Sequence, residues 1–162
     1  MDALTADFRD AMRRVAATVN VVTIAAADGS PRGLTATAVS SLSADPPSLL
    51  VCVNQSASLH GALGEAAYFC INVLHQDQAG IARNFSDPAI RERRFETGGW
   101  QTDPLGPPYL PDAAVSFICY RDQLIAFATH TIVIGTVRTI RTRVDVDPLV
   151  YLDGAYCRIA PA

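Results

Sequence analysis

Short segments of β pattern, separated by turn signals, recur along this chain and leave little room for helices. Asp28 and Gly29 supply the positive φ of a tight hairpin, so the segments on either side should pair antiparallel. About seven strands with such connections favour a closed or partly closed antiparallel barrel over a parallel α/β sheet. We therefore expect a mainly β fold with a few short helices. The predicted strands cover residues 19–24, 33–44, 49–53, 69–74, 114–120, 131–141, 149–152 and 156–159.

The helical signals are short and peripheral. Thr5 can cap an opening helix in which Phe8, Met12 and Val15 recur at helical spacing. Two further short helices are predicted over residues 58–64 and 76–85. Residues 86–112 are rich in Pro and Gly and predict a long irregular excursion around one helical turn at residues 91–95.

Length and composition indicate one domain, residues 1–162, that buries part of its surface against a second copy. A chain of 162 residues can form a real core without a second domain. Charged residues make up 18% of the chain, below the roughly 25% usual for soluble domains. A two-fold homodimer is the commonest way to cover such an apolar surface. A monomer with an oily ligand cleft is the alternative.

Charge and cysteine usage exclude several classes of function. A formal net charge of −3 gives no footprint for nucleic acid or for an anionic membrane. The chain has neither the apolar core of a secretory signal near its start nor an apolar run of membrane-spanning length, so we expect a cytoplasmic protein. Every basic residue is Arg, which excludes a Schiff-base lysine. The four cysteines lack metal-ligand spacing, so we expect reduced core thiols and no metal.

A stretch of small side chains occupies a predicted strand where bulkier residues are usual. Alanine and short hydroxyl groups permit close approach to the main chain and offer hydrogen bonds. This combination suits the edge of a planar ligand. The alternative is a small-residue strand packed tightly against a neighbour. The residues concerned are Thr35, Ala36, Thr37, Ala38, Ser40 and Ser41.

A phosphate site is predicted at the start of the helix that follows the third strand. The chain has neither the GxGxxG nor the GxxxxGK[ST] phosphate loop. Ser56 and Ser58 instead lie where backbone N–H groups at a helix start can bind an anion, although Ser58 could simply cap that helix. A flat ring on one strand and a phosphate at the next helix describe the two ends of a flavin nucleotide.

His130 is the histidine that best fits a role in catalysis. It opens a predicted strand at the end where barrel mouths hold ligands, whereas His60 and His75 lie beside helix starts. A structural histidine paired with a nearby carbonyl is the alternative for His130. No Ser-His-Asp arrangement or GxSxG elbow is present, so the chemistry is expected to come from a cofactor.

Ordered blocks of sequence resemble the flavin reductase family with a flavin-binding split barrel, from Phe8 to Ile159. The blocks are FRDAM, GLTATAVSSLSADPPSLLVCVNQSASL, FCINVLHQDQAGIARNFS, RF with GGWQT, THTIVIGTV and PLVYLDGAYCRI. The resemblance implies a homodimer of split barrels that uses NADH or NADPH to reduce flavin. In that case the reduced flavin serves a separate flavin-dependent monooxygenase.

The resemblance also implies roles for individual residues. Thr37 and the loop serines depart from the family pattern, since many relatives have Asn at the first position and a basic residue in the loop. The resemblance therefore implies weaker binding of the flavin phosphate. FMN is the expected flavin, and FAD is the second candidate. The flavin ring and ribityl chain would lie on Thr35, Ala36, Thr37, Ala38, Val39, Ser41 and Leu42, the phosphate on Ser56, Ala57 and Ser58, the distal flavin on Arg83, Asn84 and Phe85, and the nicotinamide near His130 and Tyr156.

Two other functions stay open at this point. A non-catalytic flavin- or haem-binding protein on the same split barrel would keep the pocket without turnover. A flavin oxidase related to pyridoxine-phosphate oxidases would need additional cationic phosphate ligands, which the sequence does not reveal.

Overall fold

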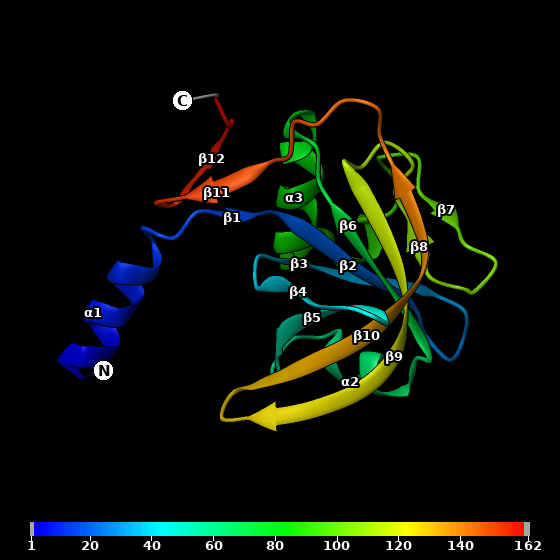
Figure 1. The fold of residues 1–162 in the computed structure, drawn as a ribbon, viewed down its shortest axis with the longest axis horizontal. Helices are drawn as coiled ribbons and strands as arrows, with labels where there is room; N and C mark the ends of the chain where they lie inside the picture. The colour runs from blue at the N-terminus through cyan, green and yellow to red at the C-terminus, as the bar shows by residue number, and fades with distance from the viewer. Residues whose placement is uncertain (1, 161–162) are drawn as a thin grey trace.

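A seven-stranded antiparallel sheet forms the body of the protein in the computed structural model, which describes residues 2–160 (Figure 1). Every pair of neighbouring strands is antiparallel, which confirms the expected mainly β fold. The strand order is β3-β2-β6-β9-β10-β5-β4. The strands are β2 (Asn20–Ala25), β3 (Pro31–Ala36), β4 (Val39–Ala44), β5 (Pro47–Asn54), β6 (Tyr68–Val73), β9 (Val115–Phe127) and β10 (His130–Thr142).

The two edge strands of this sheet are consecutive in the chain. Thr37 and Ala38 alone separate β3 from β4, so the small-residue stretch forms two strands rather than one. The chain therefore crosses from the first strand of the sheet to the last in two residues, and β3 also contacts β5. The sheet must curl for its two edges to meet in this way. We call this meeting point, Thr37 and Ala38, the sheet margin.

The β9–β10 hairpin is longer than the sequence predicts. Each strand has 13 residues, whereas the β pattern ended at residue 120. The sequence did not reveal the second half of β9, because its apolar pattern is interrupted by the polar residues Arg121, Asp122 and Gln123. Asp122 instead accepts hydrogen bonds from the backbone N–H (2.8 Å) and the hydroxyl (2.5 Å) of Thr136 across the hairpin. The outer half of β9 remains exposed and projects from the sheet (Figure 1).

The first helix, α1 (Ala3–Met12), stands away from the rest of the molecule (Figure 1). Its N-cap is Asp2, whose carboxylate accepts a 2.7 Å hydrogen bond from the backbone N–H of Thr5. The prediction of Thr5 as the cap was therefore wrong by three positions. No residue of α1 is buried. Arg13 attaches the end of the helix to the body through a 3.0 Å ion pair with Asp153.

The second helix begins later than predicted. It is α2 (His60–Glu65), and its N-cap, Leu59, makes no side-chain cap hydrogen bond. The alternative reading of Ser58 as a helix cap is therefore wrong, and the serine is free for another role. The prediction for residues 76–85 corresponds to the 3-10 turn η1 (Gln76–Gln78) followed by α3 (Ala79–Ser86). The long excursion contains η2 (Pro88–Arg93) and the two short strands β7 (Gln101–Thr102) and β8 (Pro108–Tyr109).

The core lies on the two faces of the curled sheet. One cluster fills the space toward α2 and includes Val22, Val51, Leu63, Phe69 and Val133. The other lies toward α3 and a small sheet made of β1 (Ala17–Thr18), β11 (Val150–Leu152) and β12 (Ala155–Cys157), and includes Val19, Val21, Leu74, Phe85 and Leu149. Among residues 2–160, no helix has the length and apolar character needed to cross a membrane.

Candidate functional site

The sheet margin carries an open surface of small side chains. Thr37 and Ala38 are exposed, as are Ser40, Ser41 and Leu42 on β4, while Val39 is half-buried. Because several of these side chains reach solvent, they are not packed tightly against a neighbouring strand of this chain. The Ala38 carbonyl accepts a 3.0 Å hydrogen bond from Cys52 N, which fixes the backbone of the margin against β5.

Helix α3 is attached to β3 beside the margin. The Thr35 hydroxyl donates a 2.9 Å hydrogen bond to the carbonyl oxygen of Ala82. Gly33 lies directly beneath the Phe85 ring, where an added Cβ would come within 2.7 Å of Cε1. Thr35 and Ala36 are consequently half-buried, and they present the inner part of the surface that Thr37 and Ala38 continue outward.

The three consecutive helix residues predicted to contact a flavin point in different directions. Arg83 lies over the Tyr156 ring, with 5.4 Å between Cζ and the ring centroid, so the structure brings these two predicted residues together. Asn84 donates a 3.1 Å hydrogen bond to the hydroxyl of Thr97 on the other side of the helix. Phe85 is 2% exposed and packs on aromatic neighbours in the core. Of the three, Arg83 has the most accessible side chain.

The loop between β5 and α2 is held in shape by its own side chains. Asn54 Oδ1 accepts hydrogen bonds from the backbone N–H (2.9 Å) and the hydroxyl (2.8 Å) of Ser56. Ser56 is therefore engaged within the loop, and Ala57 N donates to Asn54 O at 3.0 Å. Ser58 lies two residues before α2 and lines a cavity. The loop thus offers the Ser58 side chain rather than a helix N-terminus.

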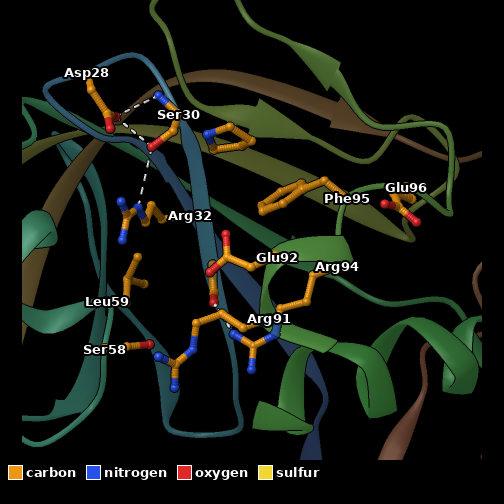
Figure 2. A pocket seen from close by; sticks show the side chains of 12 residues that line it. Asp28, Ser30, Arg32, Ser58, Leu59, Arg91, Glu92, Arg94, Phe95 and Glu96 are labelled. Atoms are coloured by element: carbon orange, nitrogen blue, oxygen red, sulfur yellow. Dashed lines mark hydrogen bonds between the residues drawn. The ribbon is translucent and has the colours of Figure 1, made fainter. Parts of the chain in front are cut away.

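That cavity, of about 540 Å³, lies between the β2–β3 hairpin, the Ser58 loop and η2 (Figure 2). Sequence reasoning missed its arginines, because Arg32 and Arg91 belong to segments far apart in the chain. The run of arginines within DPAIRERRF was the available signal. In Figure 2 the Arg91 guanidinium is directed toward Ser58. The lining residues are Asp28, Ser30, Pro31, Arg32, Gly33, Ser58, Leu59, Arg91, Glu92, Arg94, Phe95 and Glu96.

Arg94 has a structural role in the wall of this cavity. Its guanidinium donates to three backbone carbonyl oxygens, at 3.1 Å to Asn84, 3.2 Å to Gly33 and 2.9 Å to Asp87. Burial, with the nearby charge of Arg91, lowers the pKa of Arg94 below its ordinary value. Arg94 therefore connects α3, β3 and η2 and gives the cavity a rigid side.

His130 lies at the first position of β10, at the tip of the long hairpin and opposite Asn54 on β5. Its side chain is exposed, and its ring Nδ1 lies 2.9 Å from the Thr129 hydroxyl. The ring has no carbonyl partner among the described residues. The Gln55 amide donates to the His130 carbonyl at 3.2 Å, which joins the hairpin tip to the loop that contains Ser58.

The other histidines have structural partners. His60 Nε2 lies 2.8 Å from the Thr131 hydroxyl. His75 is buried, with Nδ1 2.8 Å from Asp77 and Nε2 3.0 Å from Asp145. The Asp145 contact is close but does not have the alignment of a hydrogen bond. No group of three or more His, Cys, Asp or Glu within residues 2–160 is placed to hold a metal ion.

The four cysteines are free within the described chain, and two of them, Cys70 and Cys119, are buried. Burial raises the pKa of the Cys119 thiol to about 12, and it raises the pKa of Cys70 as well. Both thiols therefore stay protonated at neutral pH and are poor nucleophiles.

Comparison with known proteins shows one consistent match. Residues 12–160 match the model of the flavin reductase like domain. The chain is 41% identical, over 96% of its length and 88% of the relative, to the reductase component of an FADH(2)-dependent resorcinol hydroxylase from Rhizobium sp.. It is 38% identical, over 92% of its length and 83% of the relative, to the FMN reductase (NADH) RutF of Pseudomonas syringae pv. syringae.

A solved structure with the same fold is the NADH:FAD oxidoreductase SgcE6 of Streptomyces globisporus, in complex with NAD and FAD fragments. It superimposes with a TM-score of 0.89 at 29% identity, and the match covers 97% of this chain and 93% of that one.

Proposed function

Because the chain belongs to the family of flavin reductase-like domains, we propose that it transfers hydride from NADH to FMN or FAD and supplies the reduced flavin to a separate oxygenase. The observation that carries this proposal is the exposed sheet margin beside an arginine-lined cavity. A planar ring can lie on the first surface while its phosphate reaches the second. A flavin nucleotide needs both a flat surface for its ring and a polar site for its phosphate.

The residues present fit a bound flavin. Thr37 and Ala38 have no bulk that would hold a ring away from the backbone, and they are exposed. With Thr35, Ala36, Val39, Ser41 and Leu42, they would form the surface for the isoalloxazine and ribityl groups. Ser58 would hold the phosphate with help from Arg91, while Ser56 and Ala57 would shape the loop. Arg83 and Tyr156 would lie at the distal part of the flavin site, with Asn84 and Phe85 positioning α3.

Bound flavin would supply the electron-accepting chemistry. The overall exchange, in which NADH, flavin and a proton give NAD⁺ and dihydroflavin, balances without a further reactant. The protein's part is orientation of the two reactants. With Nδ1 of His130 2.9 Å from the Thr129 hydroxyl, Nε2 would be available to hydrogen-bond the carboxamide of the nicotinamide and help to orient it.

Release of the reduced product follows from modest affinity. The proposed phosphate contacts come from one serine, Ser58, and the exposed side chain of Arg91. The resorcinol hydroxylase relative is named as a reductase component, which supports delivery of reduced flavin to a monooxygenase partner. NADH is the expected donor, since two of the relatives compared above carry it in their names.

A homodimer would cover the apolar surface that this chain leaves open. Leu4, Phe8 and Met12 follow one another at helical spacing on α1, and they are 79%, 62% and 48% exposed. The projecting hairpin adds Ile125 and Phe127, which are 44% and 75% exposed. These exposed apolar side chains support an interface with a second copy of the chain. The four free thiols support a cytoplasmic location, since reducing compartments keep cysteines unpaired.

Anaerobic absorbance tests the proposed function. Purified protein is mixed with an excess of FMN, FAD or riboflavin, and NADH or NADPH is added in turn. We expect the flavin band to bleach through many turnovers with NADH. A yellow preparation that is not bleached by either nicotinamide would identify a non-catalytic flavin-binding protein instead.

A further inference from the structure

Asn20 is a polar residue that is buried at the start of β2, beside the sheet margin. Its side chain is 0% exposed. Asn20 lies opposite Ala36 in the β2–β3 ladder, and Ala36 is the last residue of β3 before Thr37. The Asn20 amide Nδ2 donates hydrogen bonds to the carbonyl oxygen of Ala36 at 3.1 Å and to that of Thr18 at 3.0 Å. One carboxamide therefore connects the end of β3 to β1.

The hydrogen bond to Ala36 sets the direction of the next peptide group. A trans peptide is planar, so the Ala36 carbonyl and the Thr37 N–H point in opposite directions. Because Asn20 holds the carbonyl from the buried side, the Thr37 N–H points away from the buried carboxamide. No group within residues 2–160 accepts a hydrogen bond from this N–H. The exposed margin thus has a free donor whose direction is fixed by Asn20.

A second buried asparagine shows a carboxamide whose role is structural. Asn72 on β6 is also 0% exposed, and its Nδ2 donates to the Val21 carbonyl at 3.0 Å. Its Oδ1 accepts from the Leu110 N–H and from the Ser116 hydroxyl, both at 2.8 Å. In contrast, Oδ1 of Asn20 has no hydrogen-bond partner in the described part of the chain. An unpaired buried acceptor costs stability, so stability alone explains Asn20 less well than Asn72.

The free N–H of the margin suits the edge of a flavin ring. The isoalloxazine edge carries carbonyl oxygens and ring nitrogens, which accept hydrogen bonds. A donor that is already oriented binds such an acceptor without the cost of ordering it. The hydrogen bond to Thr18 also holds β1 against the end of β3, and β1 pairs with β11 (Figure 1). The peptide that follows Ala36 is therefore braced from the small sheet as well.

We propose that Asn20 is a positioning residue for the flavin ring. Through the Ala36 carbonyl it directs the Thr37 N–H at an acceptor on the edge of the isoalloxazine, and it does not touch the flavin itself. The inference rests on the proposed function, and it adds a residue that sets the ring geometry of that same site.

Substitution of Asn20 tests the proposal. Asn20→Leu keeps a similar volume and removes both donors, and Asn20→Ser places a smaller side chain at the same position. Each variant is titrated with riboflavin and with FMN, and the absorbance spectrum of the bound flavin is recorded. Both flavins should bind about tenfold more weakly and by the same factor, because the ring rather than the phosphate loses a contact. The visible absorbance band of the bound flavin should shift.

Asn72→Leu and Asn72→Ser are the matched controls. They remove a buried carboxamide from the same sheet, but one that has no contact with the margin. Urea unfolding should show a larger loss of stability for these variants than for the Asn20 variants, because Asn72 forms more hydrogen bonds. Their folded forms should bind riboflavin and FMN with the affinity and the spectrum of the wild-type protein.

Three results would overturn the proposal. One is wild-type flavin affinity and spectrum in a folded Asn20 variant. Another is an equal loss of flavin affinity in the Asn72 variants, which would attribute the loss to general stability. The third is failure of both Asn20 variants to fold, which would make Asn20 a structural residue. In each case, reduction of riboflavin by NADH in the wild-type protein would leave the proposed function standing, whereas a wild-type protein that reduces no flavin would remove that function.

Discussion

The Thr35 hydroxyl donates a 2.9 Å hydrogen bond to the carbonyl oxygen of Ala82, and this contact joins an edge strand of the sheet to helix α3. Arg83 follows Ala82 directly and lies over Tyr156. The orientation of β3 and the position of the arginine are therefore set by the same short segment of helix.

Replacing Thr35 by Val should loosen this junction at nearly constant volume. A lost neutral hydrogen bond costs about 0.5–1.5 kcal/mol of the free energy of unfolding. Flavin affinity should fall with it, because β3 carries the proposed ring surface. Urea unfolding and flavin titration measure the two effects. Thr35→Ser retains the hydroxyl and should retain both properties; equal losses in the two variants would show that the methyl group matters instead.

His130→Ala should lower kcat about tenfold or more at unchanged flavin affinity, because one hydrogen bond that positions the nicotinamide is lost. Stopped-flow reduction of bound flavin by NADH measures the step directly. Thr129→Val removes the hydroxyl beside Nδ1 and should give a smaller decrease. If His130→Ala reduces flavin at the wild-type rate with both nicotinamides, His130 has no part in the reaction.

Gly135→Ala should destabilise the sheet. Gly135 lies on β10 opposite the buried Phe69 ring, where a Cβ would come within 2.5 Å of Cζ and 2.9 Å of the Cβ of Cys119. Overpacking of this kind costs about 1–3 kcal/mol. Chemical denaturation provides the measurement, and Phe69→Leu in the same chain should recover part of the loss.

Gly61→Ala is the matched control for this substitution. Gly61 lies in α2, and an added Cβ there meets no atom within 4 Å. Alanine in a helix interior is more stable than glycine by about 0.5–1 kcal/mol. A destabilised Gly61→Ala variant would mean that the glycine-to-alanine change itself, rather than the Phe69 contact, explains the Gly135 result.

Asp145→Asn should lower stability at neutral pH but not in strong acid. A side-chain hydrogen bond from Arg143 lowers the pKa of Asp145 below its ordinary value of 3.8. A carboxyl whose pKa is lowered on folding contributes stability above its unfolded-state pKa and loses it as the pH falls through the folded-state value. Urea unfolding at a series of pH values should therefore show the wild-type and variant curves converging below about pH 4. Parallel curves would contradict the lowered pKa.

Phe8→Ser should shift the protein from dimer to monomer. Phe8 is 62% exposed and lies at the centre of the apolar face of α1, so its removal should weaken an interface without touching the core of this chain. Sedimentation velocity distinguishes the two states. Asp7→Ser, the neighbouring polar position, should leave the dimer intact. A wild-type protein that sediments as a monomer at high concentration would contradict the proposed interface.

The sequence predicted the antiparallel fold because hairpins have local causes. Gly29 has a φ of 79°, as the Asp28–Gly29 signal required, and β2 and β3 pair around it. Helix ends were less predictable, since Asp2 and Thr5 are both competent caps and only the backbone conformation of Asp2 selects it. The polar half of β9 was missed because its stabilising contacts, such as Asp122 with Thr136, join separate strands.

The candidate site was predictable where its residues lie in one segment and not where they come from distant segments. The exposed small residues at Thr37 and Ala38 were visible as a composition anomaly within one segment. The presence of Arg32 and Arg91 in the wall of one cavity was not visible in the sequence, because it depends on how η2 folds back toward the β2–β3 hairpin. The backbone hydrogen bonds of Arg94 determine that fold-back, and nothing in the sequence distinguishes Arg94 from the arginines beside it.

A flavin bound at the sheet margin, as proposed, would contact both edge strands of the sheet. Because such a ligand would bridge β3 and β4, its binding free energy would oppose local opening of these two strands. Flavin binding and the local stability of the sheet edges would then be thermodynamically linked, so that each favours the other. Release of the reduced flavin to a partner protein would therefore be accompanied by increased mobility of the sheet margin.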